Sequence, residues 1–256
     1  MVATLALIGV GACGGGAKGN SLSSTAAPDG EASSASGRAV RTQIGHVRVV
    51  VVGRSVRGRE ILARVVGDPA AARRVLVVGC VHGNETAGEA ITRRLRSAVP
   101  PAGSVFWLVD EFNPDGCQTN TRQNAHGVDL NRNSPWHWER LEGPGGTYYS
   151  GPGPLSEPES RAINRLVRRL HPVLSIWYHQ HASLVDDSSG GSLAIESRYA
   201  RAVGLPLRNY GVFPGSITTW QDVTYPHDSA FVVELPAGPL PPSSLARHVA
   251  AVLALR

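Results

Sequence analysis

Residues 75–85 of the sequence read Val-Leu-Val-Val-Gly-Cys-Val-His-Gly-Asn-Glu. A run of β-branched and aliphatic residues bounded by glycine is typical of a buried strand. We expect this strand to end near Gly79 and to place His82 and Glu85 on the loop beyond it. An imidazole and a carboxylate that turn toward one point are suited to be the first two ligands of a zinc ion.

The segments around this stretch predict an α/β fold. Residues 46–54 and 59–67 have the pattern of two strands joined by a hairpin, and residues 105–109 that of another buried strand. Residues 86–99 have helical periodicity, so two strands and the helix between them predict a parallel pair joined by a right-handed crossover. Further expected elements are a turn at 113–116, a long polar loop to about 149, a helix at 156–170 that opens with the capping box Ser156-Glu-Pro-Glu159, strands at 173–178 and 231–235, and helices at 196–203 and 245–255.

The composition limits the class of protein. The chain has 256 residues, 42% of them hydrophobic and 18% charged, which allows a substantial core in one α/β domain or two small ones. The formal net charge is +5, but the arginines are scattered and Lys18 is the only lysine. No basic stripe is interleaved with aromatic residues, so we expect no nucleic-acid partner.

The N-terminal segment differs in composition from the rest. Residues 1–13 are short, apolar and rich in small residues, which is typical of an export signal and too short for a transmembrane helix. The ending Val10-Gly-Ala-Cys13 resembles a bacterial lipoprotein signal, so Cys13 is a candidate for lipidation and membrane anchorage. Because no Lys or Arg precedes the apolar run, an ordinary secretory signal is the alternative. Residues 14–44, rich in Gly, Ser and Ala, are expected to be a flexible tether.

If Cys13 is lipidated, Cys80 and Cys117 remain as an even pair. Each lies at the end of an expected strand that leads to the candidate site. In an oxidising compartment a disulfide between them would brace two loops of that site. Two buried free thiols are the alternative, because the sequence does not give the separation of the two Cα atoms.

Two later strand ends supply further polar groups. Glu234 interrupts Phe-Val-Val-Glu-Leu, a run otherwise suited only to burial, and a buried unpaired carboxylate costs several kcal/mol or has a raised pKa. This predicts a functional carboxylate; a glutamate on a strand edge facing solvent is the alternative. The strand at 173–178 leads to His179-Gln-His181, and either histidine is a candidate ligand. Two histidines and Glu85 give the number of protein ligands found in catalytic zinc sites.

An ordered set of motifs resembles the zinc carboxypeptidase family. The set comprises His82-Gly-Asn-Glu85, Asn113-Pro-Asp-Gly116, Arg122, Gly127-Val-Asp-Leu-Asn-Arg-Asn133, Ser150-Gly-Pro152 with Ser156-Glu-Pro-Glu159, Trp177-Tyr-His-Gln180 and Phe231-Val-Val-Glu-Leu235. It extends over about residues 45–255 and is most similar to the short bacterial branch that includes murein tripeptide amidases. No single motif is specific to this family. The occurrence of all of them in this order along the chain is specific to it.

The resemblance implies a role for each matched residue. His82, Glu85 and His179 would bind one zinc ion per chain, because the Trp-Tyr-His-Gln context favours His179 over His181. The other residues would act on His82 or on the substrate. Asp129 would accept the free N–H of His82, Arg122 would face the scissile carbonyl, Asn131 and Arg132 would hold the terminal carboxylate of the substrate, Tyr210 would cover it, and Glu234 would be the general base.

The resemblance also implies a fold and an activity. The fold would be a three-layer α/β/α sandwich around a mixed, mostly parallel, twisted sheet, formed by residues 45–256 as one catalytic domain of a monomer. The enzyme would be a zinc metallocarboxypeptidase or peptide amidase that cuts an amide bond next to a free carboxylate with zinc-activated water. Export favours peptidoglycan stem peptides, cut between γ-D-glutamate and diaminopimelate. A general carboxypeptidase acting on peptides, and an inactive peptide-binding module, are the alternatives.

Overall fold

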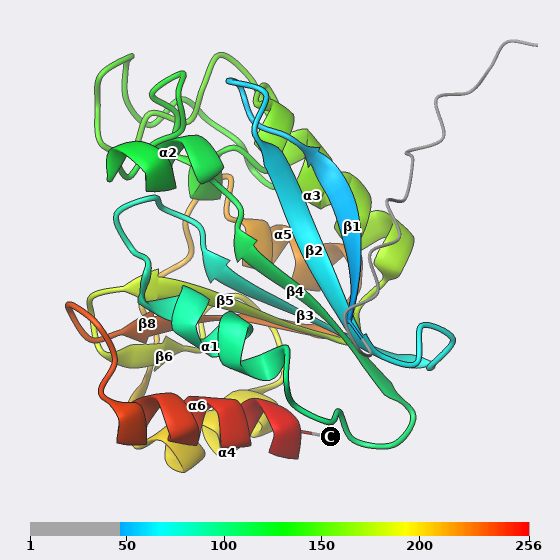
Figure 1. Cartoon of the computed structure of the whole chain (residues 1–256). Helices are drawn as coiled ribbons and strands as arrows, with labels where there is room; N and C mark the ends of the chain where they lie inside the picture. The colour runs from blue at the N-terminus through cyan, green and yellow to red at the C-terminus, as the bar shows by residue number, and fades with distance from the viewer. Residues whose placement is uncertain (1–46, 256) are drawn as a thin grey trace, which may run out of the picture. The chain divides into compact units, whose positions relative to one another are not determined.

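The strand expected at residues 75–81 is β3 (Arg73–Cys80), an interior strand of one eight-stranded sheet in the computed structural model, which describes residues 47–255 (Figure 1). The other strands are β1 (Val47–Arg54), β2 (Glu60–Gly67), β4 (Ser104–Glu111), β5 (Leu174–Gln180), β6 (Leu184–Asp186), β7 (Leu207–Arg208) and β8 (Ser229–Leu235). The predicted export signal, lipidated Cys13 and tether lie outside the described residues. Within the described part of the chain, no helix is both long enough and apolar enough to cross a membrane.

Strand directions confirm a mixed, mostly parallel sheet. The strand order is β1-β2-β4-β3-β5-β8-β6-β7. The β3–β4, β3–β5, β5–β8 and β6–β7 pairs are parallel, and the β1–β2, β2–β4 and β6–β8 pairs are antiparallel. Because parallel strands end at the same edge of a sheet, the segments that follow β3, β5 and β8 meet there.

Helices cover both faces of this sheet (Figure 1). They are α1 (Ala87–Leu95), α2 (Pro114–Thr119), α3 (Pro158–Leu170), α4 (Leu193–Val203), α5 (Ile217–Thr224) and α6 (Pro242–Ala254), with the short 3-10 helix η1 (Leu130–Arg132). On one face, Ile91 of α1 and Tyr199 of α4 belong to a core that includes α6. On the other face, Ile163 of α3 and Trp220 of α5 belong to a second core. The predicted three-layer α/β/α sandwich is therefore confirmed.

The segment 113–116 is not the isolated turn that its composition predicts. It begins α2, because Asn113 Oδ1 accepts a hydrogen bond from Gly116 N at 2.9 Å and Pro114 occupies the first helical turn. Asparagine at the N-cap and proline in the first turn favour a helix start as well as a turn, so the same residues fit both structures.

The predicted capping box at α3 was also wrong. The N-cap residue is Glu157 rather than Ser156, and no side chain caps the helix start. Glu159 does not reach back to Ser156 but accepts a hydrogen bond from Val56 N at 3.0 Å. The Glu159 carboxylate thus accepts a backbone N–H of the turn between β1 and β2. Local sequence does not reveal a partner so distant along the chain.

The loop after β3, which carries His82 and Glu85, lies directly against the start of α2. A Cβ atom on Gly83 would lie 1.9 Å from the carbonyl carbon of Gly116. Only glycine allows two backbones to approach this closely. The position of the loop therefore depends on Gly83.

We predict that Gly83→Ala lowers the free energy of unfolding by about 1–3 kcal/mol or more, because the loop and α2 must move apart. Urea denaturation measures this change. Gly143→Ala is the matched control, since a Cβ on Gly143 meets no atom within 4 Å; its effect should stay within about 0.5 kcal/mol. Equal stability of the two variants would contradict the close approach.

Candidate metal and substrate site

Three candidate metal ligands meet at the edge of the sheet where β3 and β5 end. His82 Nδ1 lies 2.9 Å from Glu85 Oε1 and 3.1 Å from His179 Nδ1. Glu85 Oε2 lies 3.0 Å from His179 Nδ1. All three residues are buried, and they form one of two groups among residues 47–255 with a geometry able to hold a metal ion.

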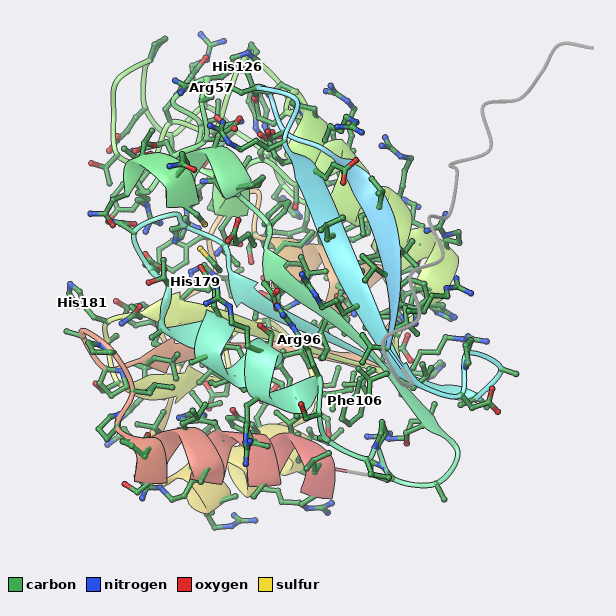
Figure 2. The ribbon with its side chains drawn as sticks, in the orientation of Figure 1. Arg57, Arg96, Phe106, His126, His179 and His181 are labelled. Carbon is green, nitrogen blue, oxygen red and sulfur yellow. The ribbon has the colours of Figure 1, made fainter. Side chains whose placement is uncertain are left out.

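The structure brings His179, and not His181, to this group. Strand β5 ends at Gln180, so the alternation of side chains along the strand does not extend to His181. His181 is exposed and projects at the margin of the molecule, whereas His179 lies further in (Figure 2). The N–H of Gln180 donates to Glu85 Oε2 at 3.1 Å and holds the end of β5 against the ligand loop.

Asp129 is fully buried beside these ligands. Its Oδ1 accepts hydrogen bonds from His82 Nε2 and Asn131 N, both at 2.9 Å. Its Oδ2 accepts from Arg122 Nη2 at 2.8 Å and from Arg122 Nε at 3.1 Å. Burial opposes the charge, but the contacts with His82 and Arg122 outweigh it and hold the pKa of Asp129 well below its usual range.

The bond to Asp129 determines which nitrogen of His82 faces the other ligands. An ionised carboxylate only accepts hydrogen bonds, so His82 Nε2 carries a proton, which leaves Nδ1 as the nitrogen that would bind a metal ion. Burial raises the pKa of Glu85, but hydrogen bonds with His179 and His82 lower it below its usual range, so Glu85 is ionised as well.

This donor set fits zinc. Two imidazole nitrogens and one carboxylate oxygen are ligands that zinc prefers, and a tetrahedral zinc ion separates its ligand atoms by roughly 3.3 Å. The separations here are close to that value, at 2.9, 3.0 and 3.1 Å.

Arg122 belongs to the long loop between α2 and α3 and points at the same group. Its Nη1 lies 3.0 Å from Glu85 Oε1 and 3.1 Å from His82 Nδ1. The side chain is 22% exposed and lines a cleft of about 590 Å³ together with the three candidate ligands. The guanidinium therefore borders both the ligands and the space open to a substrate.

Asn131 and Arg132 line this cleft from η1 and are both buried. Asn131 Oδ1 accepts the N–H of Ile217 at 3.2 Å, which leaves the side-chain N–H groups for a ligand. Arg132 Nε is buried without a hydrogen-bond partner, and no carboxylate of residues 47–255 forms an ion pair with Arg132. A buried cation that no carboxylate pairs with directly is costly, so this arrangement fits an anionic ligand.

Two aromatic residues that the sequence did not predict flank Arg132. The rings of Phe213 and Tyr148 have centroids 4.4 Å and 5.6 Å from the guanidinium carbon. These cation–π contacts orient the arginine, and no sequence pattern links the three segments. Tyr210 lies on the loop of Phe213, lines the cleft and is 50% exposed. The structure thus places Tyr210 at the rim, near the other predicted substrate residues.

Glu234 lies beside His179 on the sheet. The two are register partners in the parallel β5–β8 pair, so their side chains share a face roughly 5 Å apart. Strand β8 lies between β5 and β6, which excludes the alternative of a sheet-edge position. Glu234 is buried, lines the cleft and accepts a hydrogen bond from Ala182 N at 3.3 Å.

Cys80 and Cys117 lie close to the ligands as free thiols. Their Sγ atoms are 2.8 Å apart, and Cys80 Sγ lies 3.1 Å from His82 O. With Glu89 they form the second group of described residues able to hold a metal. The disulfide remains a prediction; it would tie the loop after β3 to α2.

An α/β sheet that presents a buried His–Glu–His donor set, a further carboxylate and a buried arginine in one cleft has the arrangement expected of a metal-dependent hydrolase. A family model described as zinc carboxypeptidase matches residues 38–98 and 102–188. Murein peptide amidase A of Escherichia coli strain K12 is 31% identical over 170 residues, which cover 59% of this chain and 68% of that protein. The same enzyme of Vibrio campbellii is 30% identical over 186 residues, covering 66% and 72%. The chain belongs to the zinc carboxypeptidase family and is a hydrolase.

Solved structures share the fold. The murein-tripeptide amidase of Escherichia coli O157 has a TM-score of 0.64 and 26% identity, covering 81% of this chain and 90% of that one. Carboxypeptidase A of Helicoverpa armigera has a TM-score of 0.68 at 17% identity, covering 80% and 66%. Both confirm the fold that the resemblance implied.

We predict that Asp129→Ala weakens zinc binding by about 10- to 100-fold, because His82 loses the group that fixes its tautomer and orientation. Competition with a chromogenic chelator measures the affinity. Asp115→Ala is the matched control: Asp115 is a buried carboxylate that accepts hydrogen bonds from Arg57 N and Arg59 Nη1. An equal loss of zinc affinity in both variants would contradict the assigned role of Asp129.

Proposed function

We propose that the chain is a zinc-dependent enzyme that hydrolyses an amide bond next to a free carboxylate. The observation that carries the proposal is the position of Arg132, a buried guanidinium that forms no ion pair with a carboxylate of residues 47–255, in the same cleft as His82, Glu85 and His179. The three ligands would hold the zinc ion, and Arg132 would hold the carboxylate of the substrate.

The substrate would be oriented mainly by η1. The planar guanidinium of Arg132 binds a carboxylate through two hydrogen bonds, and the Asn131 side chain adds a further donor. Tyr210, at the rim, would cover the bound residue. A substrate held by its terminal carboxylate presents the neighbouring amide bond to the ligand group, which is the geometry that a carboxypeptidase or peptide amidase requires.

Zinc, when bound, supplies a Lewis acid that polarises the scissile carbonyl and lowers the pKa of a water molecule. Glu234 would take the proton from the attacking water and give it to the leaving amine, because its carboxylate lies on the same face as His179. Arg122 would stabilise the negative charge that develops on the carbonyl oxygen; one such donor typically contributes ~3–4 kcal/mol to the transition state.

Peptidoglycan stem peptides are the substrate that we favour, cut between γ-D-glutamate and diaminopimelate. The support is the similarity to murein peptide amidases and the export signal predicted at residues 1–13. The chain would then act outside the cytoplasm, anchored through Cys13 or secreted, and as a monomer.

A general carboxypeptidase is the second candidate, because a site for a terminal carboxylate suits any peptide with a free C-terminus. Carboxypeptidase A6 of mouse is 30% identical over 173 residues, although the match covers only 40% of that protein. An inactive peptide-binding module has less support, since the candidate ligands, Arg122 and Glu234 all line one cleft.

We predict that Glu234→Gln lowers kcat by about 10²- to 10⁴-fold while zinc content and KM change little, because only the proton acceptor is lost. Steady-state kinetics and metal analysis measure these quantities. Glu142→Gln, at a half-buried position that lines the same cleft, is the control. Unchanged turnover in Glu234→Gln would refute the mechanism, and a wild type that binds peptides without cleaving them would favour the binding module.

We predict that the zinc-loaded protein cleaves L-Ala-γ-D-Glu-diaminopimelate more efficiently than any member of a hippuryl-amino-acid panel. Chromatography of the products gives kcat/KM for each substrate. If the protein cleaves only hippuryl substrates, the proposal of a peptidoglycan substrate is wrong, and a general carboxypeptidase activity takes its place.

A further inference from the structure

Four carboxylates line the cleft, and two of them, Glu142 and Asp186, have no role in the mechanism above. Glu85 contacts the two histidines, Glu234 lies beside His179, and Glu142 accepts the N–H of Tyr148 at 3.0 Å. The fourth is Asp186, the last residue of β6, which is 7% exposed. Buried carboxylates are almost always paired, yet no Arg or His of residues 47–255 forms an ion pair with Asp186.

The sheet register places Asp186 on the same face as Glu234. Leu184 is the register partner of Glu234 in the antiparallel β6–β8 pair, and Asp186 follows two residues later. Side chains two residues apart in a strand point to the same face. The Asp186 and Glu234 positions are therefore diagonal neighbours, roughly 7–8 Å apart.

Asp186 belongs to a cluster with more hydrogen-bond acceptors than donors. Its Oδ1 accepts the N–H groups of Ser188 and Tyr210, both at 3.0 Å. Ser188 Oγ lies 2.7 Å from Asp186 Oδ2 and 2.8 Å from Gly211 O. The single hydroxyl proton of Ser188 can be donated to Asp186 Oδ2 or to Gly211 O, but not to both. The acceptor that does not receive it remains available to a donor on a ligand. An ammonium group carries three donors and a positive charge, which suits this cluster.

Acidic side chains lie near Asp186, and its register partner in β7, Arg208, donates to Leu207 O and forms no ion pair with it. Glu196 lies behind Asp186 in α4, where burial and then the charges of Asp187 and Asp186 raise the pKa of Glu196 to about 7. The negative potential of this region attracts a cation.

One loop connects this acidic end of the cleft with the arginine end. Tyr210, near the start of the loop, donates its N–H to Asp186, and Phe213 lies over the guanidinium of Arg132. Further on, a Cβ at Gly215 would lie 2.1 Å from Arg132 O, so the loop is packed tightly against η1. If the leaving residue of a substrate binds Arg132 through its carboxylate, the side chain of that residue would lie beside this loop.

We propose that Asp186, with Ser188 Oγ and Gly211 O, binds an amine on the side chain of the leaving residue. This inference rests on the proposed function. An extended lysine-type side chain places its nitrogen roughly 6 Å from its Cα, a reach comparable to the separation of Asp186 from Glu234. Lysine and diaminopimelate both carry an amine at this position of the side chain. The substrate class is thus a peptide whose leaving residue carries an ammonium group at its side-chain end, and Asp186 is the specificity-determining residue.

The test compares leaving residues that differ only in this amine. Peptides ending in lysine and in norleucine are assayed on both the L-Ala-γ-D-Glu and the hippuryl acyl groups. For the wild type, kcat/KM should favour lysine by about 10- to 100-fold, the usual effect of a charged hydrogen bond. Asp186→Asn should remove most of this preference while norleucine peptides are still cleaved. Asp187→Asn is the control with the same charge change one residue away, outside the cleft lining, and should keep it.

The outcomes separate this inference from the proposed function. A wild type that cleaves both peptides equally well, or an Asp186→Asn variant that keeps the preference, overturns the role of Asp186 and leaves the hydrolase intact. Failure to cleave any peptide overturns the proposed function, and the inference with it. If Asp186→Asn does not fold, Ser188→Ala replaces it, and a reduced preference for lysine is again the expected result.

Discussion

The arrangement of the site depends on the four hydrogen bonds that the buried carboxylate of Asp129 accepts. They come from His82 Nε2, Asn131 N and two nitrogens of Arg122. An ionised group in the interior is tolerated only with such partners, so the bonds are obligatory rather than incidental. Through them one side chain sets the tautomer of the candidate ligand His82, the direction of Arg122, and the start of the helical turn that carries Arg132. The loop at 120–133 is thus ordered by charge rather than by secondary structure.

Charge is also divided along the cleft. Arg122 and Arg132 supply positive charge where a carboxylate and a developing oxyanion would lie, and Asp186 supplies negative charge beyond them. Each of these groups is held by contacts that do not involve a ligand, such as the ring of Phe213 over Arg132 and the backbone donors at Asp186. A cleft preorganised in this way would orient a substrate at both ends and so position a single amide bond against Glu234 and the candidate zinc ligands.

The sequence predicted the parts of this site that lie at the ends of long buried strands. β3, β5 and β8 are apolar runs, each followed or interrupted by a polar residue, and that contrast indicated His82, His179 and Glu234. The family resemblance added Asp129, Arg122 and Arg132, which lie in a loop without periodicity. β6 and α5 were missed. β6 has three residues and forms through its pairing with β8 and β7, and α5 contains β-branched residues that disfavour helix. Asp186 and Phe213 lie in or beside such segments, so their roles became apparent only in three dimensions.

The central claim is that His82, Glu85 and His179 bind the catalytic zinc. The most direct measurement is anomalous diffraction at the zinc absorption edge from crystals grown with zinc. We predict a strong peak between His82 Nδ1, the Glu85 carboxylate and His179 Nδ1, with Asp129 still accepting a hydrogen bond from His82 Nε2. A peak only at the second group, Cys80, Glu89 and Cys117, or no peak at either group, would contradict it.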